Sequence, residues 1–269
     1  YVEVVKIVRP KVFLLENVKG ILSKDNGAIF KEIVDTFGDP DNFDGDKYYL
    51  HYKVCKAVEF GIPQRRERVV VIGVLNKDFD IEKLFEETKG KIELVEPNFF
   101  TPVSLHEAIS DIPMPTEDGE CTLNPCESEY QASMRNATGT IKNHIASKHN
   151  GLAVGRMQNV GAGQNWQVLE EEIHSVHSGA YGRLEWNQPT MTITTRFDTP
   201  AGGRFIHPEE NRTLTPREAA RVQSFPDSFE FIGNKTIVCK QIGNAVPPKL
   251  SFFLANAVNQ LLCEQSKKS

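Results

Sequence analysis

The stretch RPKVFLLENVKG, residues 9–20, decides how the first part of the chain folds. Its apolar run, Val12–Leu15, is short and stops at the polar pair Glu16-Asn17, which is typical of a buried strand. A helical pattern over 27–37 follows it, and later apolar runs predict two more strands, at 48–57 and 69–75. The order strand, helix, strand, strand indicates an α/β fold.

The second half of the chain is expected to be loop-rich before its last helices. Periodicity is poor from 113 to about 187, where Gly, Asn, Pro and Thr are common. The Thr-rich stretch 188–196 predicts a strand, and a capping box that begins at Thr215 predicts a helix to about Ser224. Pro247-Pro248 opens a last helix with an apolar stripe along one face.

Composition is that of an ordinary globular protein. The 269 residues are 39% hydrophobic and 25% charged, so global disorder is not expected. No apolar run reaches the roughly 18 residues of a membrane span, and no signal-peptide pattern opens the sequence. The five cysteines include no CxxC pair, which indicates reduced thiols in a cytoplasmic protein and no metal site.

Charge is unevenly distributed along the sequence. The net charge of −5 argues mildly against nucleic acid as a partner, because phosphate contacts require Lys and Arg. Residues 101–130, however, hold seven acids and no Lys or Arg, whereas 131–168 hold four bases and no acid. This asymmetry is compatible with a nucleic-acid-binding face and equally with a chance fluctuation in solvated loops.

Three short segments are candidates for a functional site. Glu16 ends a buried strand, where burial would favour its protonated form and let it donate a proton near neutral pH. On this signal alone, a glutamate that only caps a neighbouring helix is the more common case. In Gln64–Arg68, Arg66 and Arg68 should share one strand face as an anion clamp, while Arg65 is better explained as part of a solvated turn. Gln241–Pro248 offers Gly and Asn before the last helix, or is simply an ordinary helix start.

Taken together, five ordered segments resemble the cytosine-C5 DNA methyltransferases. They cover about residues 5–75 and 180–262, more than half of the chain: RPKVFLLENVKG, GIPQRRERVVVIG, YGRLEWNQPTMTITTRF, GRFIHPEENRTLTPREAARVQSFPD and QIGNAVPP. Residues 97–180 fall where this family keeps its variable target-recognition region. The resemblance implies part of a Rossmann-like S-adenosylmethionine-dependent methyltransferase domain and a smaller, loop-rich target-recognition domain.

The resemblance also implies the chemistry. Family members flip a cytosine out of double-stranded DNA, attack its C6 with a cysteine thiolate and transfer the methyl group of S-adenosylmethionine to C5. Glu16 matches the glutamate that binds N3 and the amino group of the cytosine. Arg68 matches the arginine that holds O2, and Arg66 its partner in that site. Asn244 and Ala245 match the segment that closes over the cofactor.

Two motifs of the family have no counterpart here. Its Gly-rich cofactor loop and its Pro-Cys nucleophile loop should precede residue 5. The pair Pro125-Cys126 lies after the arginine motif, in the recognition region, and so does not match the nucleophile loop. We therefore expect an inactive fragment whose partner is the missing N-terminal part of the enzyme, on the same or a separate chain.

From these segments we expect four regions. Residues 1–96 should form the back part of the catalytic domain, and 97–215 the recognition domain. Residues 216–240 should act as a hinge, and 241–269 should return to the catalytic domain. DNA should contact Lys142, Lys148 and Arg196. The compartment should be the cytoplasm of a bacterium, or the nucleus if the source is eukaryotic.

Two rival functions remain open. One is a tRNA methyltransferase of the same family, which would carry a Cys-Phe-Thr signature that this sequence lacks. The other is a non-catalytic DNA-binding or activating subunit. The absent nucleophile suits such a subunit, but Glu16, Arg66 and Arg68 would have no chemical task in it.

Overall fold

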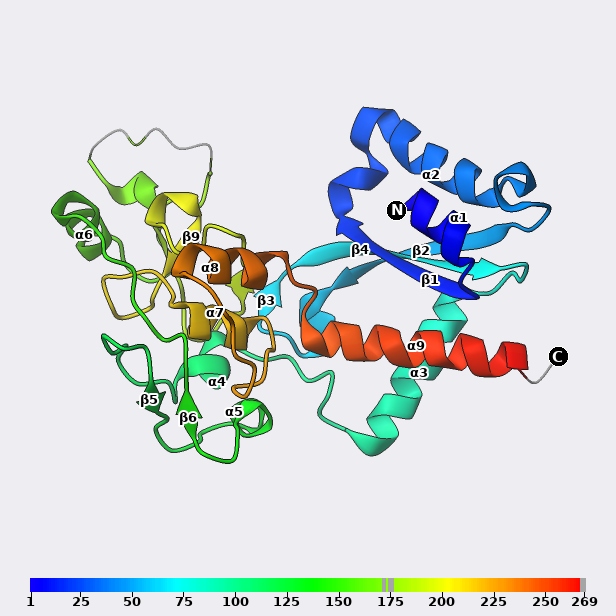
Figure 1. Cartoon of the computed structure of the whole chain (residues 1–269). Coiled ribbons are helices and arrows are strands. Elements are labelled where there is room, and N and C mark those ends of the chain that lie inside the picture. Colours follow the sequence, from blue (N-terminus) through cyan, green and yellow to red (C-terminus); the bar gives the residue numbers. More distant parts are fainter. Residues whose placement is uncertain (171–172, 174–176, 267–269) are drawn as a thin grey trace. The chain divides into compact units, whose positions relative to one another are not determined.

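The chain forms two compact units, shown in a computed structural model that describes residues 1–170, 173 and 177–266 (Figure 1). Unit 1 comprises Tyr1–Lys56, Glu67–Phe100 and Leu250–Ser269. Unit 2 comprises Ala57–Arg66 and Thr101–Lys249.

Unit 1 is built on a three-stranded sheet in the order β1-β4-β2. The strands are β1 (Val12–Val18), β2 (Tyr48–Lys56) and β4 (Glu67–Leu75), and both pairings are antiparallel. The three predicted strands are therefore confirmed, and β4 begins two residues earlier than expected. β1 forms one edge of the sheet, and no strand in the described part of the chain pairs with its outer side.

Helices cover both faces of this sheet (Figure 1). On one face lie α1 (Val2–Val8) and α2 (Ala28–Gly38). The short 3-10 helices η1 (Lys19–Leu22) and η2 (Lys24–Gly27) connect β1 to α2, and η3 (Pro40–Phe43) connects α2 to β2. On the other lie α3 (Ile81–Val95) and α9 (Pro248–Ser266). The result is a three-layer α/β/α arrangement within unit 1.

Aromatic rings fill the layer between the sheet and α2. The ring centroid of Phe13 lies 4.6 Å from that of Phe37 and 5.1 Å from that of Tyr48. Gly73, opposite Phe13 on β4, makes room for this ring, because a Cβ there would lie 2.3 Å from two of its carbons. On the other face, Phe85 of α3 packs edge-on against Phe253 of α9.

The last helix behaves as its apolar pattern predicts. The expected stripe is buried at Leu250, Phe253, Leu254, Ala257 and Leu261. Residues at spacings of three and four lie on one side of a helix, so this stripe is continuous.

Unit 2 consists of short elements joined by long loops, as its composition predicts. Its helices are η4 (Ala57–Phe60), α4 (Leu105–Ile109), α5 (Glu129–Met134), α6 (Gly151–Gln158), η5 (Trp166–Val168), η6 (Pro200–Gly202), α7 (Pro216–Val222) and α8 (Lys235–Asn244). Its strands form three pairs: β3 (Gln64–Arg65) with β8 (Thr190–Met191), β5 (Cys121–Thr122) with β6 (Thr140–Ile141), and β7 (Gly182–Arg183) with β9 (Arg204–Ile206).

The core of unit 2 is organised around α7. The predicted capping box is present, with Thr215 and Glu218 exchanging side-chain and main-chain hydrogen bonds, and all seven residues of the helix are buried. Two ionic clusters surround it. Arg212 binds Glu218 through two hydrogen bonds of 2.8 Å, and Arg221 binds Asp111 and Asp227 with every one of these three side chains fully buried.

Two expectations differ from the structure. The predicted strand 188–196 is reduced to Thr190–Met191, because the next residues are held by side chains rather than by a neighbouring strand; Ile193 N–H, for example, donates to the Gln64 amide oxygen. The expected boundaries also differ. Residues 57–66 and 241–249 belong to unit 2, and 216–240, expected as a hinge, lie within unit 2 and include the buried α7.

Among the described residues, no helix combines the length and apolarity that a membrane crossing requires. The same residues contain no group of three or more His, Cys, Asp or Glu side chains that could hold a metal ion.

Candidate active site and DNA-binding region

Glu16 and Arg68 meet on one face of the unit 1 sheet. Glu16 stands opposite Val70, and Val18 opposite Arg68, so Glu16 and Arg68 are diagonal neighbours on adjacent strands. Glu16 Oε1 lies 3.0 Å from Arg68 Nε, and the two side chains are only 19% and 15% exposed. Burial lowers the pKa of Arg68 from its ordinary value, although the charge of Glu16 opposes this shift.

The Glu16 carboxyl group retains unused hydrogen-bonding capacity. Its buried Oε1 makes no hydrogen bond of regular geometry with any described residue, despite the short distance to Arg68. The pair is therefore a partly enclosed site with an acceptor oxygen still available for a ligand.

The outer edge of β1 runs beside this site. Leu75 N–H donates to Lys11 O at 3.0 Å, and bonded and non-bonded pairs alternate along an antiparallel ladder, so the main-chain groups of Leu14 and Glu16 point away from β4. The Tyr1 hydroxyl donates to Leu14 O at 2.9 Å on this side. We call the outer side of Val12–Glu16 the open edge.

A cysteine lies on the same face but is not presented to a ligand. Cys55 of β2 stands directly opposite Arg68 of β4, and only 3% of its surface is exposed. A nucleophile must reach the reacting carbon, so a thiol enclosed in this way does not serve. The sequence-based search did not consider Cys55, since only the strand register places it near Arg68.

Arg66 belongs to unit 2, whereas Arg68 belongs to unit 1. A break between β3 and β4 at residue 66 interrupts the strand alternation on which the predicted shared face depended. The Arg66 guanidinium is buried in unit 2 and donates to three main-chain carbonyls, those of Ile193, Gly243 and Ala245. The expected anion clamp of Arg66 and Arg68 is therefore wrong: Arg66 ties three loops together.

Around Arg66, four of the segments that carry the family resemblance converge. Gln64 donates to the Gln223 side chain at 2.7 Å, and Gln223 donates to Ile242 O at 2.7 Å. Gly243 is required here, because a Cβ would lie 2.5 Å from main-chain atoms of Thr194 and Thr195. We call this cluster, Gln64, Arg66, Ile193, Gln223 and Gly243, the motif junction. Gln64 and Gln223 were not singled out from the sequence, because each of them is far along the chain from the residue to which it donates.

Asn244 and Ala245 follow directly from the motif junction. Asn244 is the last residue of α8 and is exposed, and Ala245 is the half-buried residue after it. The Ala245 carbonyl is held by Arg66 at 3.1 Å. The junction thus fixes the main chain while leaving the Asn244 amide accessible.

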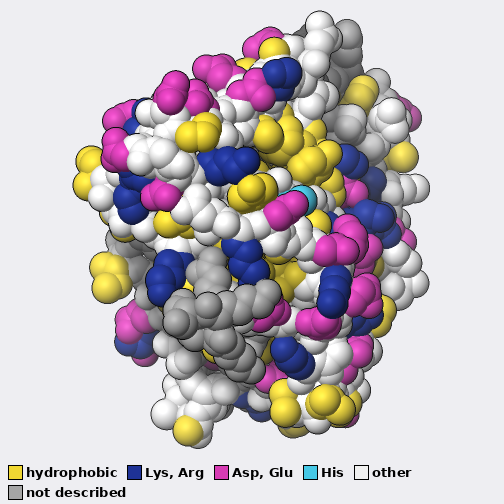
Figure 2. Space-filling view, turned by 90° about the vertical axis from the view of Figure 1, so that its right-hand side faces the viewer, with side chains coloured by type: hydrophobic (Ala, Val, Ile, Leu, Met, Phe, Trp, Pro, Cys, Tyr) yellow, Lys and Arg dark blue, Asp and Glu magenta, His cyan; other side chains and the backbone are white. Residues whose placement is uncertain are grey.

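The three residues expected to contact DNA have different surroundings. Lys142 is paired with Glu230 at 3.0 Å and lies 3.7 Å from Glu120, and its hydrogen bond to Glu230 raises its pKa. Lys148 is exposed. Arg196 is exposed in the turn after β8, with Asp198 3.9 Å away. Figure 2 likewise shows basic and acidic side chains interspersed over the face that it draws.

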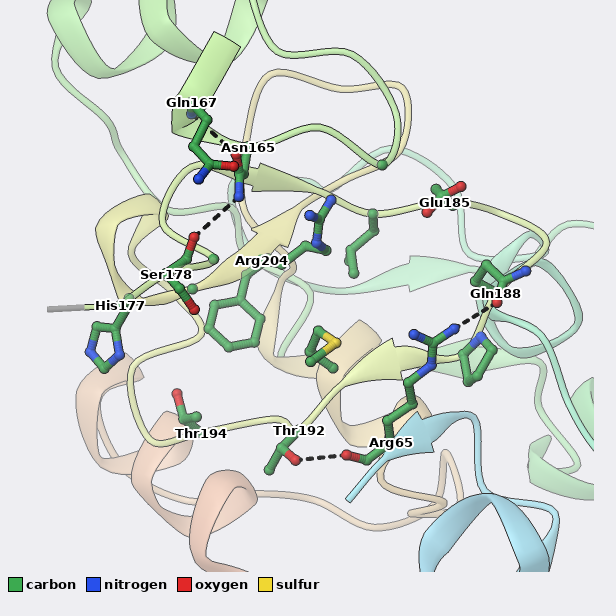
Figure 3. A pocket seen from close by; sticks show the side chains of 18 residues that line it. Arg65, Asn165, Gln167, His177, Ser178, Glu185, Gln188, Thr192, Thr194 and Arg204 are labelled. Atoms are coloured by element: carbon green, nitrogen blue, oxygen red, sulfur yellow. Dashed lines mark hydrogen bonds between the residues drawn. The ribbon is translucent and has the colours of Figure 1, made fainter. Parts of the chain in front are cut away.

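A polar cleft with a volume of about 690 Å³ opens in unit 2 (Figure 3). Its walls include Arg65, Glu185, Gln188, Thr192 and Arg204. We call it the unit 2 cleft.

Comparisons with known proteins agree with this fold. The solved structure of a putative DNA modification methyltransferase, encoded within a prophage of E. coli, matches with a TM-score of 0.69 at 23% identity, over 97% of this chain and 72% of that one. The S. pombe Dnmt2 methyltransferase matches with a TM-score of 0.52 at 13% identity. The fold is accordingly α/β, part of a Rossmann-like methyltransferase domain with a loop-rich second unit.

The sequence relatives are DNA methyltransferases. The chain is 32% identical to the type II methyltransferase M.DdeI of Desulfomicrobium norvegicum, over 96% of this chain and 65% of that protein. It is 31% identical to M.NgoFVII of Neisseria gonorrhoeae, over 97% of this chain and 61% of that protein. It thus spans slightly less than two thirds of these relatives. The model of the C-5 cytosine-specific DNA methylase family matches residues 1–260, and the chain belongs to this family.

Proposed function

We propose that the chain is the part of a DNA (cytosine-5)-methyltransferase that holds the flipped target cytosine and reads the DNA around it. The observation that carries this proposal is the Glu16–Arg68 pair. It offers a carboxyl group with an unused acceptor and a guanidinium, side by side and partly enclosed. Those two groups are complementary to the Watson–Crick edge of cytosine, with its amino donor, its N3 and its O2.

Glu16 and Arg68 would stabilise the change in the ring as a thiolate adds to C6. A C–S bond forms, the C5–C6 double bond opens, and an electron pair moves through C4 to N3. N3 then takes a proton shared with Glu16, and Arg68 balances charge on O2. S-adenosylmethionine would supply the methyl group for C5 and be left as S-adenosylhomocysteine. A base then removes the C5 proton, the C5–C6 double bond re-forms as the thiolate leaves C6, and the N3 proton returns to Glu16.

The residues present fit one side of a cofactor pocket. Members of this family use S-adenosylmethionine as methyl donor, and Asn244 offers an exposed amide next to a main chain that Arg66 holds in place. Such an amide can both donate to and accept from a polar ligand. We therefore assign Asn244 and Ala245 to the cofactor side and Arg66 to positioning them.

The nucleophile is proposed to come from a segment outside these 269 residues. Cys55 is enclosed, and the remaining four cysteines lie outside the sheet that carries Glu16 and Arg68. The open edge offers a place for that segment, because an unpaired strand edge can take up another strand. The Tyr1 hydroxyl donates to one carbonyl of the open edge, that of Leu14. In α1, which precedes β1 in the sequence, Val4, Ile7 and Val8 are exposed apolar residues.

A reconstitution experiment tests the proposal. The chain is mixed with a segment from a family member that carries the Pro-Cys and Gly-rich loops, and transfer of labelled methyl groups to DNA is measured. We expect no transfer by the chain alone and transfer to C5 of cytosine by the mixture. Transfer to RNA but not to DNA would favour the tRNA enzyme, and DNA binding without transfer in the mixture would favour the non-catalytic subunit.

A further inference from the structure

In the unit 2 cleft, the strand pairing of β3 and β8 determines the direction in which the Arg65 side chain points. β3 and β8 pair in parallel, with Gln64 opposite Thr190 and Arg65 opposite Met191. Gln64 and Thr190 are 0% and 1% exposed, so strand alternation turns Arg65 and Met191 outward. The solvated-turn interpretation of Arg65 is therefore incomplete, since its position follows from this register.

Arg65 is also held at both ends. Its Nη2 donates to the Gln188 side-chain oxygen at 2.7 Å, and its own carbonyl accepts from Thr192 Oγ1 at 3.0 Å; Figure 3 shows both bonds at the wall of the cleft. Gln188 uses one of the five guanidinium N–H groups. A side chain fixed in this way loses less rotamer freedom when it binds a ligand.

Arg204, in the same cleft, has a different role. Its Nη1 donates to Gln164 O at 2.8 Å and to Arg183 O at 3.0 Å, so it joins two loops of unit 2. Burial lowers its pKa, Glu185 opposes this shift, and the charge of Arg65 reinforces it. The charges of Arg65 and Glu185 thus both influence the pKa of Arg204, in opposite directions.

We infer that Arg65, oriented by Gln188, reads a guanine in the major groove and so fixes one position of the recognition sequence. This inference rests on the proposed function for DNA as the substrate. Guanine presents two acceptors, O6 and N7, to which arginine binds as a fork. The carboxylate of Glu185 in the same cleft repels a phosphate, which favours a base edge over the DNA backbone as the ligand.

The test is selection of binding sites from a randomised duplex library by the 269-residue chain. The wild type should enrich a motif that contains a fixed guanine. Arg65→Ala should lose the preference at that position, with affinity for the selected duplex falling about 5- to 150-fold, and its affinity for unrelated duplexes should stay nearly unchanged. The matched control is Lys83→Ala, which removes a cation from an exposed site of unit 1 and should keep the motif.

A change on the DNA side keeps the test valid if Arg65→Ala folds poorly. Replacing the selected guanine by 7-deazaguanine removes the N7 acceptor, so it should weaken binding by the wild type and leave binding by Arg65→Ala unchanged. Uniform weakening of all duplexes, an unchanged motif in Arg65→Ala, or no selected motif in the wild type would each overturn the inference. Methyl transfer by the reconstituted enzyme decides the proposed function separately: transfer with an unchanged Arg65→Ala motif rejects only the role of Arg65.

Discussion

Two acid–arginine pairs, one in each unit, differ in how completely their hydrogen bonds are used. In unit 2, Glu218 binds Arg212 through two bonds of 2.8 Å, and its Oε2 also accepts from Thr215 N–H. In unit 1, Glu16 approaches Arg68 through a single contact of 3.0 Å and retains an acceptor without a regular hydrogen bond.

The difference separates a structural pair from a candidate catalytic one. Burial alone would raise the pKa of Glu218, but Arg212 outweighs it and lowers that pKa to about 2. Both oxygens of this carboxylate already accept hydrogen bonds in a fully buried site, so it stabilises the fold and is not presented to a substrate. The partly exposed Glu16, with capacity to spare, is suited to a ligand that arrives and leaves.

Replacing Glu16 should have the largest effect on activity. In the reconstituted enzyme, Glu16→Gln keeps the shape of the side chain but cannot share a proton with N3, so the single-turnover rate should fall by about 10²- to 10⁴-fold. DNA affinity and melting temperature should change little. A near-normal rate would return Glu16 to a purely structural role.

Replacing Glu218 should have the largest effect on stability. Glu218→Gln removes the fully buried carboxylate that Arg212 binds and leaves Glu210 as the acidic partner of Arg212, which should destabilise unit 2 by about 1.5–3 kcal/mol. Urea unfolding followed by tryptophan fluorescence measures this, because both tryptophans, Trp166 and Trp186, lie in unit 2. Glu230→Gln, at an exposed pair, is the control and should change stability by no more than about 0.5 kcal/mol. Equal effects of the two substitutions would refute the structural role of the buried pair.

Lowering the pH should reduce the difference in stability between the wild type and Glu218→Gln. The pKa of Glu218 in the folded protein, about 2, lies below the ordinary value of 4.5, so its contribution to stability is complete above pH 4.5 and is lost as the pH falls toward 2. The wild-type stability of unit 2 should therefore fall over this range, and the difference from Glu218→Gln should shrink. A difference that stays constant from pH 5 to pH 2.5 would contradict this linkage.

The smallest expected effect concerns the two lysines expected to bind DNA. Lys142 is already balanced by Glu230 and Glu120, whereas Lys148 is exposed. Lys148→Ala should reduce the slope of log affinity against log salt by about one, and Lys142→Ala by less. Equal slopes for both variants would show that the acidic neighbours of Lys142 do not matter for binding.

Local signals in the sequence predicted much of the fold. The strand before Glu16 follows from its apolar run, and α7 from the capping box of Thr215 and Glu218, because such signals depend on residues three or four apart. α8 was missed, since Thr, Val and Gly in its sequence favour helix weakly and only the Asn234 cap announces it.

The site was harder to predict because its contacts span the chain. The partners of Arg66 lie 127 to 179 residues further along, so no local pattern shows that this arginine binds carbonyls instead of an anion. The register of β1, β4 and β2 was equally hidden, and it decides that Glu16, Arg68 and Cys55 share one face. Residue identity gave the candidates, and topology decides which of them meet.

The central claim is that this chain supplies the cytosine-binding pair and another segment supplies the nucleophile. DNA with 5-fluorocytosine at the target position tests it most directly, because fluorine at C5 cannot leave as a proton does and the C6–sulfur adduct therefore persists. Mass spectrometry of the reconstituted enzyme then identifies the polypeptide that is linked to DNA. The account predicts linkage to the cysteine of the added segment and none to the 269-residue chain; an adduct on any of the chain's own five cysteines would contradict it.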